Sequence, residues 1–366
     1  MIPTTELEQP GHASLRRLTA AMPKAELHLH LDGSLRVETA LMLARSRRVD
    51  APATYEGMFR ALVGPARMAS QAELLTRFDL PIALLQDVEA LERVTSELVE
   101  SKAADNVKYL EIRWGPALHV RRGLSLDDGI AAVCRAAQEA AVRTGSIVRL
   151  ICTAIRSHDP TGAVHLAETA ARFRDQGLTG WDLAGPEAAV PDPLAFERAF
   201  AAARDGGLRI TLHAGEWGGA AQVRRALALD PERIAHGPGA ADDPGLMAEL
   251  KEHGVTLDLC PTSNVQAGIV PSLAAHPLAR LHRAGVPVSL STDDTTVSDV
   301  LLSEEYIRAV EQNGLSLPEL WAIDRHALDA AFAEPNVTGP LREAFERWAT
   351  AVPELGGSDR GGPPQP

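Results

Sequence analysis

The sequence predicts an α/β fold of the (β/α)8 barrel class, also called the TIM barrel, on three observations. Eight short apolar runs alternate with longer amphipathic stretches, a pattern typical of strands and helices that build a closed parallel sheet. Polar residues follow six of these runs, at the strand ends where barrel enzymes carry their catalytic groups. The length of 366 residues also suits such a barrel, which commonly exceeds about 250 residues as one domain.

The predicted strands are short runs rich in apolar residues. In chain order they cover residues 25–31, 107–114, 147–155, 179–184, 208–214, 233–236, 255–260 and 286–292. In the first run, AELHLHL, His28 and His30 alternate with leucines. Because residues i and i+2 of a strand point to the same side, both imidazoles are predicted to project together into the barrel.

The stretches between the strands are predicted helices. Residues 127–143 carry an apolar stripe at spacings of three and four, with Asp127 or Asp128 placed to cap the helix start. The stretch 194–205 ends at two glycines, which is a typical stop signal. The segment 41–104 is too long for one crossover helix. We therefore expect extra helices inserted after the first strand, flanking the barrel mouth.

We expect one barrel domain over residues 1–350. The tail, 351–366, is rich in glycine and proline without an apolar anchor, and this composition predicts disorder. Hydrophobic residues make up 45% of the chain but aromatic residues only 4%, so the core must be largely aliphatic.

Charge and cysteine usage exclude several functional classes. The chain has 36 Lys and Arg against 49 Asp and Glu, a formal net charge of -13, and its basic residues form no run longer than a pair. Nucleic acid is therefore an unsuitable partner, because binding to a phosphate backbone needs a concentrated positive face. The three cysteines are widely spaced, which predicts small buried residues rather than a disulfide framework or a metal knuckle. With no signal-peptide pattern and no long apolar window, we expect a cytoplasmic protein without a membrane partner.

Four residues at the predicted strand ends form a candidate metal site. His28, His30, His213 and Asp293 offer three neutral nitrogens and one carboxylate. This set suits zinc and tolerates other divalent transition metals. A water molecule bound to such a metal can lose a proton near neutral pH and become a nucleophile.

Other residues at the same ends have both a functional and a structural interpretation. Glu216, in HAGE, can exchange protons with a substrate if a dry pocket raises its pKa, but alone it resembles a helix first-turn residue. Asp294 can orient a group or accept a substrate hydrogen bond, or can simply cap a helix. Gly185 allows a close backbone approach to a ligand or only a turn. A histidine such as His236 in an apolar strand is more often a core residue than a catalyst.

Six segments together resemble a known family. In order and spacing, the segments PKAELHLHLDGSL, DLAGPE, TLHAGE, RIAHG, CPTSN and STDD are similar to the motifs of the adenosine deaminase family, within the amidohydrolase superfamily. The resemblance covers roughly residues 22–345. It implies a zinc-dependent barrel enzyme that hydrolyses the 6-amino group of a purine to a 6-oxo group and releases ammonia.

The resemblance also implies residue roles. His28, His30, His213 and Asp293 correspond to the zinc ligands, and Glu216 to the acid that protonates purine N1. His236 corresponds to the residue that orients and helps to deprotonate the zinc-bound water. Asp294 holds that water or bonds N7, Gly185 meets N3 through its backbone, and Asp32 accepts a hydrogen bond from the ribose. The segment TGWDLAGPE contains no lysine, so the bridging carbamylated lysine of binuclear relatives is absent and we expect one Zn²⁺ per chain.

Three functions stay open on the sequence. The first is hydrolytic deamination of adenosine and 2'-deoxyadenosine, which Asp32 favours over free adenine. The second is the same chemistry on another 6-aminopurine: adenine, aminodeoxyfutalosine or N6-modified AMP, for which Arg113 with Arg156 would be the phosphate-binding candidates. The third is a non-catalytic nucleoside-binding barrel. Departures from the family pattern, such as Thr295 where proline is common, leave the chemistry intact and the substrate preference open. The oligomeric state is not predicted.

Overall fold

A computed structural model describes residues 10–355, and it confirms the predicted barrel fold. Eight parallel strands pair in chain order from β1 to β8. Their bounds are β1 (Lys24–His30), β2 (Val107–Trp114), β3 (Ile147–Ile155), β4 (Leu178–Ala184), β5 (Arg209–Ala214), β6 (Arg233–His236), β7 (Thr256–Leu259) and β8 (Val288–Leu290). All eight overlap the predicted runs. Most of their residues are buried, as expected for strands covered on both faces.

The barrel closes where the chain returns from β8 to β1. Leu29 forms an isolated parallel bridge with Asp293, which follows β8. The backbone nitrogen of His30 donates to the carbonyl oxygen of Asp293 at 2.7 Å, and the nitrogen of Asp293 donates to the carbonyl oxygen of His28 at 3.1 Å. The seam of the barrel therefore places Asp293 beside both histidines of the first strand.

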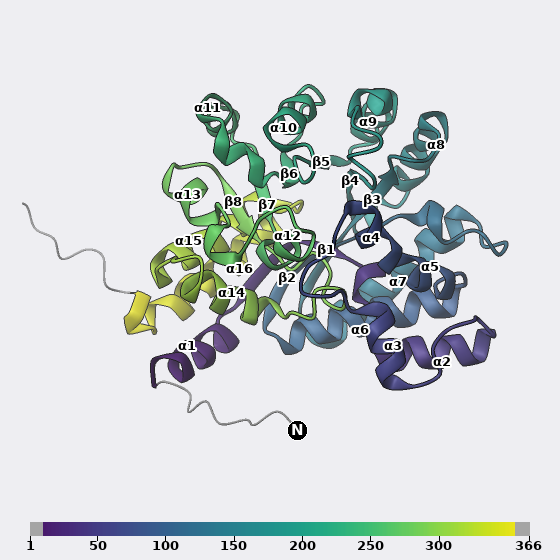
Figure 1. The fold of residues 1–366 in the computed structure, drawn as a ribbon, viewed down its shortest axis with the longest axis horizontal. Helices are drawn as coiled ribbons and strands as arrows, with labels where there is room; N and C mark the ends of the chain where they lie inside the picture. The colour runs from purple at the N-terminus through teal and green to yellow at the C-terminus, as the bar shows by residue number, and fades with distance from the viewer. Residues whose placement is uncertain (1–9, 356–366) are drawn as a thin grey trace, which may run out of the picture.

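Helices surround the strands (Figure 1). Their bounds are α1 (Pro10–Ala21), α2 (Val37–Arg47), α3 (Tyr55–Leu62), α4 (Gln71–Leu75), α5 (Asp79–Leu84), α6 (Val88–Ala104), α7 (Leu126–Thr144), α8 (Pro160–Ala171), α9 (Glu197–Asp205), α10 (Gly219–Leu227), α11 (Pro244–His253), α12 (Pro261–Gln266), α13 (Leu278–Arg283), α14 (Leu302–Glu311), α15 (Leu317–Ala330) and α16 (Pro335–Thr350). The predicted cap of α7 is wrong. The helix starts earlier, and the side chain of Ser125 accepts from the backbone nitrogen of Asp128. Both predicted aspartates lie in the first turn, where the helix dipole favours acidic residues.

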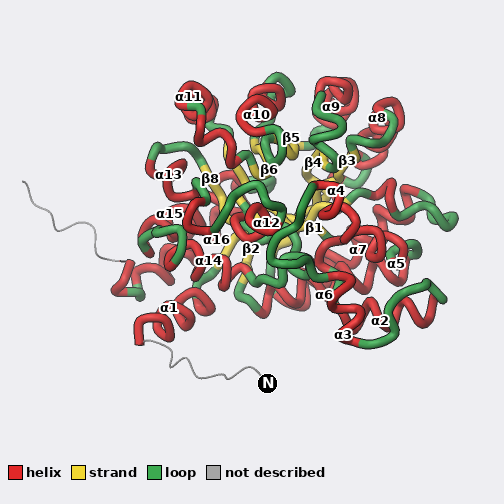
Figure 2. Tube along the Cα trace, viewed as in Figure 1, coloured by secondary structure: helices red, strands yellow, loops and turns green. Residues whose placement is uncertain are grey.

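The inserted helices are confirmed. Helices α2 to α5 precede α6 between the first two strands, joined by loops (Figure 2). Backbone hydrogen bonds hold the insertion to the barrel: Gly64 donates to Val297 at 2.8 Å and Met68 to Gln266 at 2.6 Å. Met68, Leu74, Ala267 and Val297 also form a small apolar cluster that is separate from the main core. The insertion is thus attached to the segments that follow β7 and β8.

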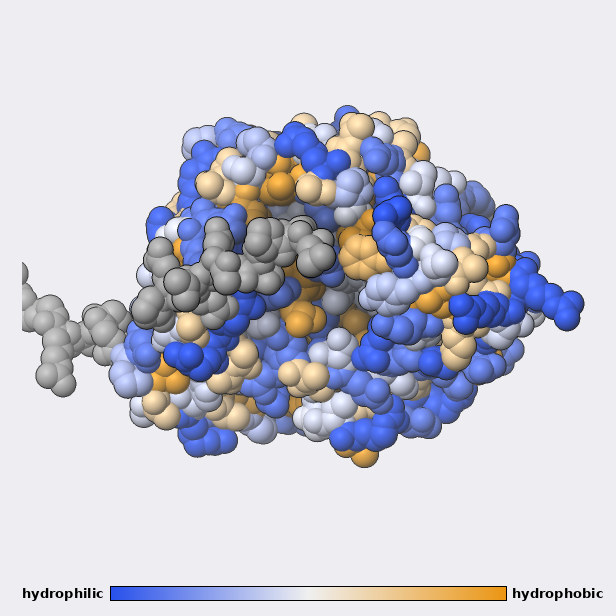
Figure 3. Space-filling model, turned by 60° about the horizontal axis from the view of Figure 1, so that its bottom comes forward, coloured by the Kyte–Doolittle hydropathy of each residue, from blue (hydrophilic) through white to orange (hydrophobic). Residues whose placement is uncertain are grey.

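The surface of the protein is mostly polar, as its composition predicts. The face in Figure 3 is mostly hydrophilic, with apolar side chains around a hollow near its centre. All three cysteines are free and buried, as predicted. Among residues 10–355, no helix has the length and apolar character needed to cross a membrane. A short 3-10 helix, Pro353–Leu355, ends the described part, and the remainder of the tail, 356–366, lies outside the described residues.

Candidate active site

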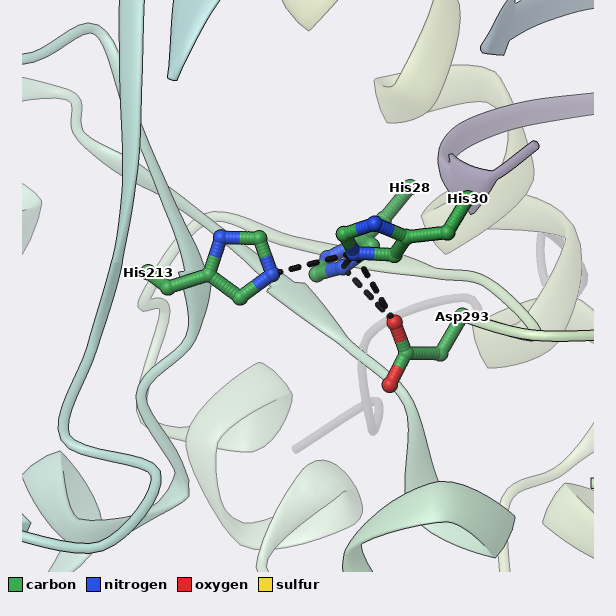
Figure 4. A group of neighbouring side chains, drawn as sticks. All are labelled: His28, His30, His213 and Asp293. Atoms are coloured by element: carbon green, nitrogen blue, oxygen red, sulfur yellow. Dashed lines mark hydrogen bonds and ion pairs between the residues drawn. The ribbon is translucent and has the colours of Figure 1, made fainter. Parts of the chain in front are cut away.

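The four predicted metal ligands come together at one end of the barrel, with His213 on β5 meeting the three residues of the closing seam (Figure 4). Their donor atoms all lie within 4.8 Å of one another, although His213 is more than 180 positions from β1. The Nε2 atom of His30 lies 3.3 Å from Nε2 of His28 and 3.2 Å from Nε2 of His213. Oδ1 of Asp293 lies 3.0 Å from Nε2 of His28 and 3.3 Å from Nε2 of His30. One carboxylate oxygen and three ring nitrogens therefore face a common point.

This donor set fits a divalent cation. Burial, with the nearby His213 and Arg113, lowers the pKa of His30 to about 3, although Asp293 opposes the shift. Burial also lowers the pKa of His28 well below its usual value. Both imidazoles are then neutral at physiological pH, which is the form that binds a metal. Where unprotonated ring nitrogens face one another this closely, they have no hydrogen to share. A cation at their centre would accept all of their lone pairs.

Partners behind the cluster orient two of its members. Nδ1 of His213 lies 3.0 Å from Oδ1 of Asp182, so its Nε2 is turned toward the cluster. Oδ2 of Asp293 accepts a hydrogen bond from Ser263 at 2.7 Å, which leaves Oδ1 for the cluster. Burial alone would raise the pKa of Asp182, but His213 and Arg113 outweigh it, and the pKa is lowered. A charged carboxylate behind a ligating imidazole fixes its tautomer and strengthens the ligand.

Glu216 lies in the pocket as a largely buried carboxyl group. Its side chain is 11% exposed, and Oε1 is 3.8 Å from Nε2 of His236. Burial, together with the charges of Asp293 and Glu187, raises the pKa of Glu216 to about 8. The carboxyl group therefore keeps its proton near neutral pH, which is what a general acid needs.

Glu187 fixes the loop that carries Glu216, a role that the sequence analysis missed. Its carboxylate accepts three backbone hydrogen bonds, from Gly215 at 2.7 Å, Trp217 at 2.7 Å and Gly218 at 2.9 Å. Glu187 is buried directly after β4, within the DLAGPE segment. The sequence signal for this role is the position of Glu187, an acidic residue that closely follows a predicted strand.

The side chain of Asp294 packs directly against Gly33. A Cβ atom on Gly33 would lie 1.6 Å from Oδ1 of Asp294, so this position requires glycine. Oδ1 of Asp294 is buried without a hydrogen-bond partner among the described residues. Burial, with the charges of Asp293, Asp32 and Glu216, raises the pKa of Asp294 well above its usual value. Its unpaired oxygen is thus available to a ligand. The place of Gly33 in the first motif, directly after Asp32, does not by itself predict this contact.

A pocket of about 300 Å³ joins the predicted site residues to the inserted helices. All of the predicted site residues line it except His28; they are His30, Asp32, Gly185, His213, Glu216, His236, Asp293 and Asp294. Leu74, Phe78 and Ile82 contribute an apolar wall from the insertion. A larger cavity, of about 790 Å³, includes Val148, Gly177 and Gly207 at the opposite strand ends. None of the predicted site residues lines that larger cavity within the described chain.

The two arginines considered for phosphate binding lie elsewhere. Arg113 is buried, with Nη2 donating to the Leu27 carbonyl at 3.0 Å, and Arg156 donates to the His213 carbonyl at 2.9 Å. Within the described chain, neither lines the pocket, so they are excluded as phosphate-binding candidates there. Arg121 lines it instead and is exposed.

A parallel barrel with three imidazoles, a carboxylate and a protonated glutamate at one end defines a metal-dependent hydrolase of the amidohydrolase class. The chain belongs to the adenosine deaminase family, whose sequence model matches residues 23–348. It is 35% identical over 330 residues to an adenosine deaminase of Enterococcus faecalis, covering 89% of this chain and 96% of that protein.

Solved structures share this fold. An adenine deaminase from Arthrobacter aurescens has a TM-score of 0.84 at 27% identity, covering 90% of this chain and all of its own. An N6-mAMP deaminase of Arabidopsis has a TM-score of 0.81 at 34% identity, covering 90% and 99%. An amidohydrolase from Burkholderia ambifaria, solved with bound Zn, has a TM-score of 0.85 at 26% identity, covering 94% of each chain. The protein is a hydrolytic deaminase, as these relatives and the family match indicate.

Proposed function

We propose that this deaminase converts adenosine and 2'-deoxyadenosine to the 6-oxo nucleosides with release of ammonia. The observation that carries the proposal is the burial of Glu216, with its pKa raised to about 8, in the same pocket as the imidazole and carboxylate cluster. The curated relatives named as adenosine deaminases, with 34–36% identity in several bacteria, support the choice of substrate.

One Zn²⁺ per chain would be held by His28, His30, His213 and Asp293. When bound, zinc supplies the Lewis acidity that lets a water molecule lose its proton near neutral pH. The zinc-containing structural neighbour supports this metal, and the neutral imidazoles described above support these ligands. The backbone bridge between Leu29 and Asp293 at the seam of the barrel already places Asp293 beside the two histidines of β1.

The remaining chemistry belongs to side chains of the pocket. Attack at C6 of a purine disrupts an aromatic ring, so the ring must first become more electrophilic. Glu216 would donate its proton to N1, which draws electrons away from C6. His236 and Asp294 would orient the attacking water and manage its protons. The C6–N bond then breaks, the amino group leaves as ammonia, and the water oxygen remains as the 6-oxo group.

Two pocket residues would hold the rest of the substrate. Asp32 is buried, and its Oδ1 has no hydrogen-bond partner among the described residues, so it can accept a bond from a ribose hydroxyl. Gly185 has φ +106, and a Cβ atom there would lie 3.2 Å from Ile155. This position thus gives a purine close access to the backbone.

The alternative is the same chemistry on another 6-aminopurine. The exposed guanidinium of Arg121 at the pocket and the Arabidopsis neighbour favour N6-modified AMP among these. No described side chain in the pocket wall specifically favours adenine or aminodeoxyfutalosine. A non-catalytic nucleoside-binding barrel is disfavoured, since every residue that the chemistry needs is present.

A substrate panel tests the proposal. Zinc-loaded protein should convert adenosine and 2'-deoxyadenosine, which is followed as a decrease in absorbance near the absorbance maximum of these nucleosides. Their kcat/KM should be higher than that of adenine, aminodeoxyfutalosine, AMP or N6-methyl-AMP. Turnover of one of the other compounds without turnover of adenosine would contradict the proposal and support the alternative, another 6-aminopurine as the substrate. Nucleoside binding without any turnover would support the non-catalytic alternative.

A further inference from the structure

A buried chain of hydrogen bonds leads from His236 into the wall of the barrel. It runs through Asn264 on α12 and His276, and ends at the backbone nitrogen of Leu278 on α13. His236, Asn264 and His276 are each at most 3% exposed. The mechanism above uses His236 but neither of the other two side chains.

The direction of this chain follows from its fixed end. The backbone nitrogen of Leu278 can only donate, so Nδ1 of His276 accepts its hydrogen bond, at 3.2 Å. Burial, with His236 nearby, lowers the pKa of His276 to about 3, which makes this imidazole neutral. Its single proton is therefore on Nε2, which donates to Oδ1 of Asn264 at 3.1 Å.

The amide of Asn264 determines which atom donates in its hydrogen bond with His236. With Oδ1 engaged by His276, the amide nitrogen Nδ2 faces Nδ1 of His236 at 3.2 Å and donates to it. The opposite amide orientation would place two N–H groups face to face at His276, and a buried donor without an acceptor is costly. Nδ1 of His236 thus accepts, and in the neutral ring the proton lies on Nε2.

Nε2 of His236 points into the active site. It lies 3.8 Å from Oε1 of Glu216 and 3.7 Å from Oδ2 of Asp293. His236 also has φ +67, a conformation that is uncommon for residues other than glycine, and the contact of its Nδ1 with Asn264 holds the ring from the opposite side. The ring therefore offers an N–H group, rather than a lone pair, to whatever occupies the site.

We propose that Asn264 and His276 are positioning residues that present His236 to the substrate water as a hydrogen-bond donor through Nε2. This proposal rests on the proposed function. In this tautomer, neutral His236 holds the oxygen of the water and has no free nitrogen to accept its proton. The proton must then pass first to a group of the pocket other than His236.

The decisive variant is Asn264→Asp. A carboxylate at this position still accepts from His276 but cannot donate, so it should accept from Nδ1 of His236 and move the proton of the ring from Nε2 to Nδ1. We expect kcat to fall by as much as about 10⁴-fold, the scale of loss when a catalytic histidine is held in the wrong tautomer. KM and zinc content should change little, because Asn264 is not among the residues that line the pocket within the described chain.

His276 supplies a second pair of variants in case Asn264→Asp does not fold. His276→Gln keeps an N–H that can donate to Asn264 and should retain most of kcat. His276→Leu removes that donor, frees the amide of Asn264 to rotate, and should lower kcat at unchanged KM. His253→Leu, at the exposed end of α11, is the matched control and should leave kcat unchanged.

NMR of zinc-loaded protein with isotope-labelled imidazole nitrogens reads the tautomer directly. We expect the Nε2–H form of His236 in the wild type and the Nδ1–H form in Asn264→Asp. A wild-type Nδ1–H form, full kcat in Asn264→Asp, or equal kcat in His276→Gln and His276→Leu would overturn the proposal. Because this measurement needs no substrate, failure of adenosine turnover, which concerns the proposed function, is distinguished from failure of the tautomer assignment.

Discussion

Oδ1 of Asp182 lies 3.0 Å from Nδ1 of His213, and both side chains are buried. Oδ2 of Asp182 also accepts a hydrogen bond from the hydroxyl group of Thr153 at 3.1 Å, which holds the carboxylate in place. Since a partner of this kind holds the tautomer and orientation of a metal-binding imidazole, the pair links β4 to the proposed zinc ligand His213 on β5.

Asp182→Asn should weaken zinc binding by about 10- to 100-fold, because the imidazole loses its charged acceptor. Competition with a chelator, measured as retained zinc per chain, checks this expectation. Asp175→Asn, at an exposed position in the short 3-10 helix before β4, is the control and should behave as the wild type. Equal zinc retention in both variants would remove the assigned role of Asp182.

Glu216→Gln should retain zinc and substrate binding while losing most turnover. The amide has nearly the same shape but has no acidic proton to give to N1, and general acid catalysis is worth about 10²- to 10⁴-fold. Steady-state kinetics with metal analysis separate these effects. Turnover near the wild-type value would show that another group protonates the purine.

The pH dependence of kcat/KM follows from the pKa of Glu216, which is raised to about 8. The active form is the protonated acid, which is present below this pKa and lost above it. The rate should therefore fall as pH rises through about 8. A pH–rate profile of zinc-loaded protein measures this limb, and a rate that stays constant well above pH 8 would argue against Glu216 as the acid.

Gly33→Ala should abolish most activity without unfolding the barrel. The added Cβ would lie 1.6 Å from Oδ1 of Asp294, which must then move. Gly339→Ala is the control, since nothing lies within 4 Å of a Cβ atom there. Kinetics and thermal unfolding of both variants compare the two positions. Wild-type activity in Gly33→Ala would mean that the position of Asp294 does not matter for turnover.

The sequence could predict the barrel and the residues that gather at its mouth. Strand periodicity is local, and the polar residues directly follow the strands, so His28, His30, His213 and Asp293 could be grouped before any distance was known. Their convergence then depends only on the barrel closing, which brings the ends of parallel strands to one rim.

Contacts between loops could not be predicted in this way. Glu187 binds backbone groups of the following strand's loop, and His276 reaches His236 only through Asn264. Such pairs depend on loop conformation and side-chain rotamers, which leave no periodic pattern in the sequence. The same holds for Arg113 and Arg156, whose carboxylate and carbonyl partners became evident only with the fold.

Zinc analysis of the wild type and His213→Ala tests the central claim, that four side chains from distant parts of the chain hold one metal beside Glu216. We predict one zinc per chain in the wild type and a strongly reduced content in His213→Ala, with adenosine turnover lost in parallel. Full zinc occupancy in His213→Ala would contradict the account.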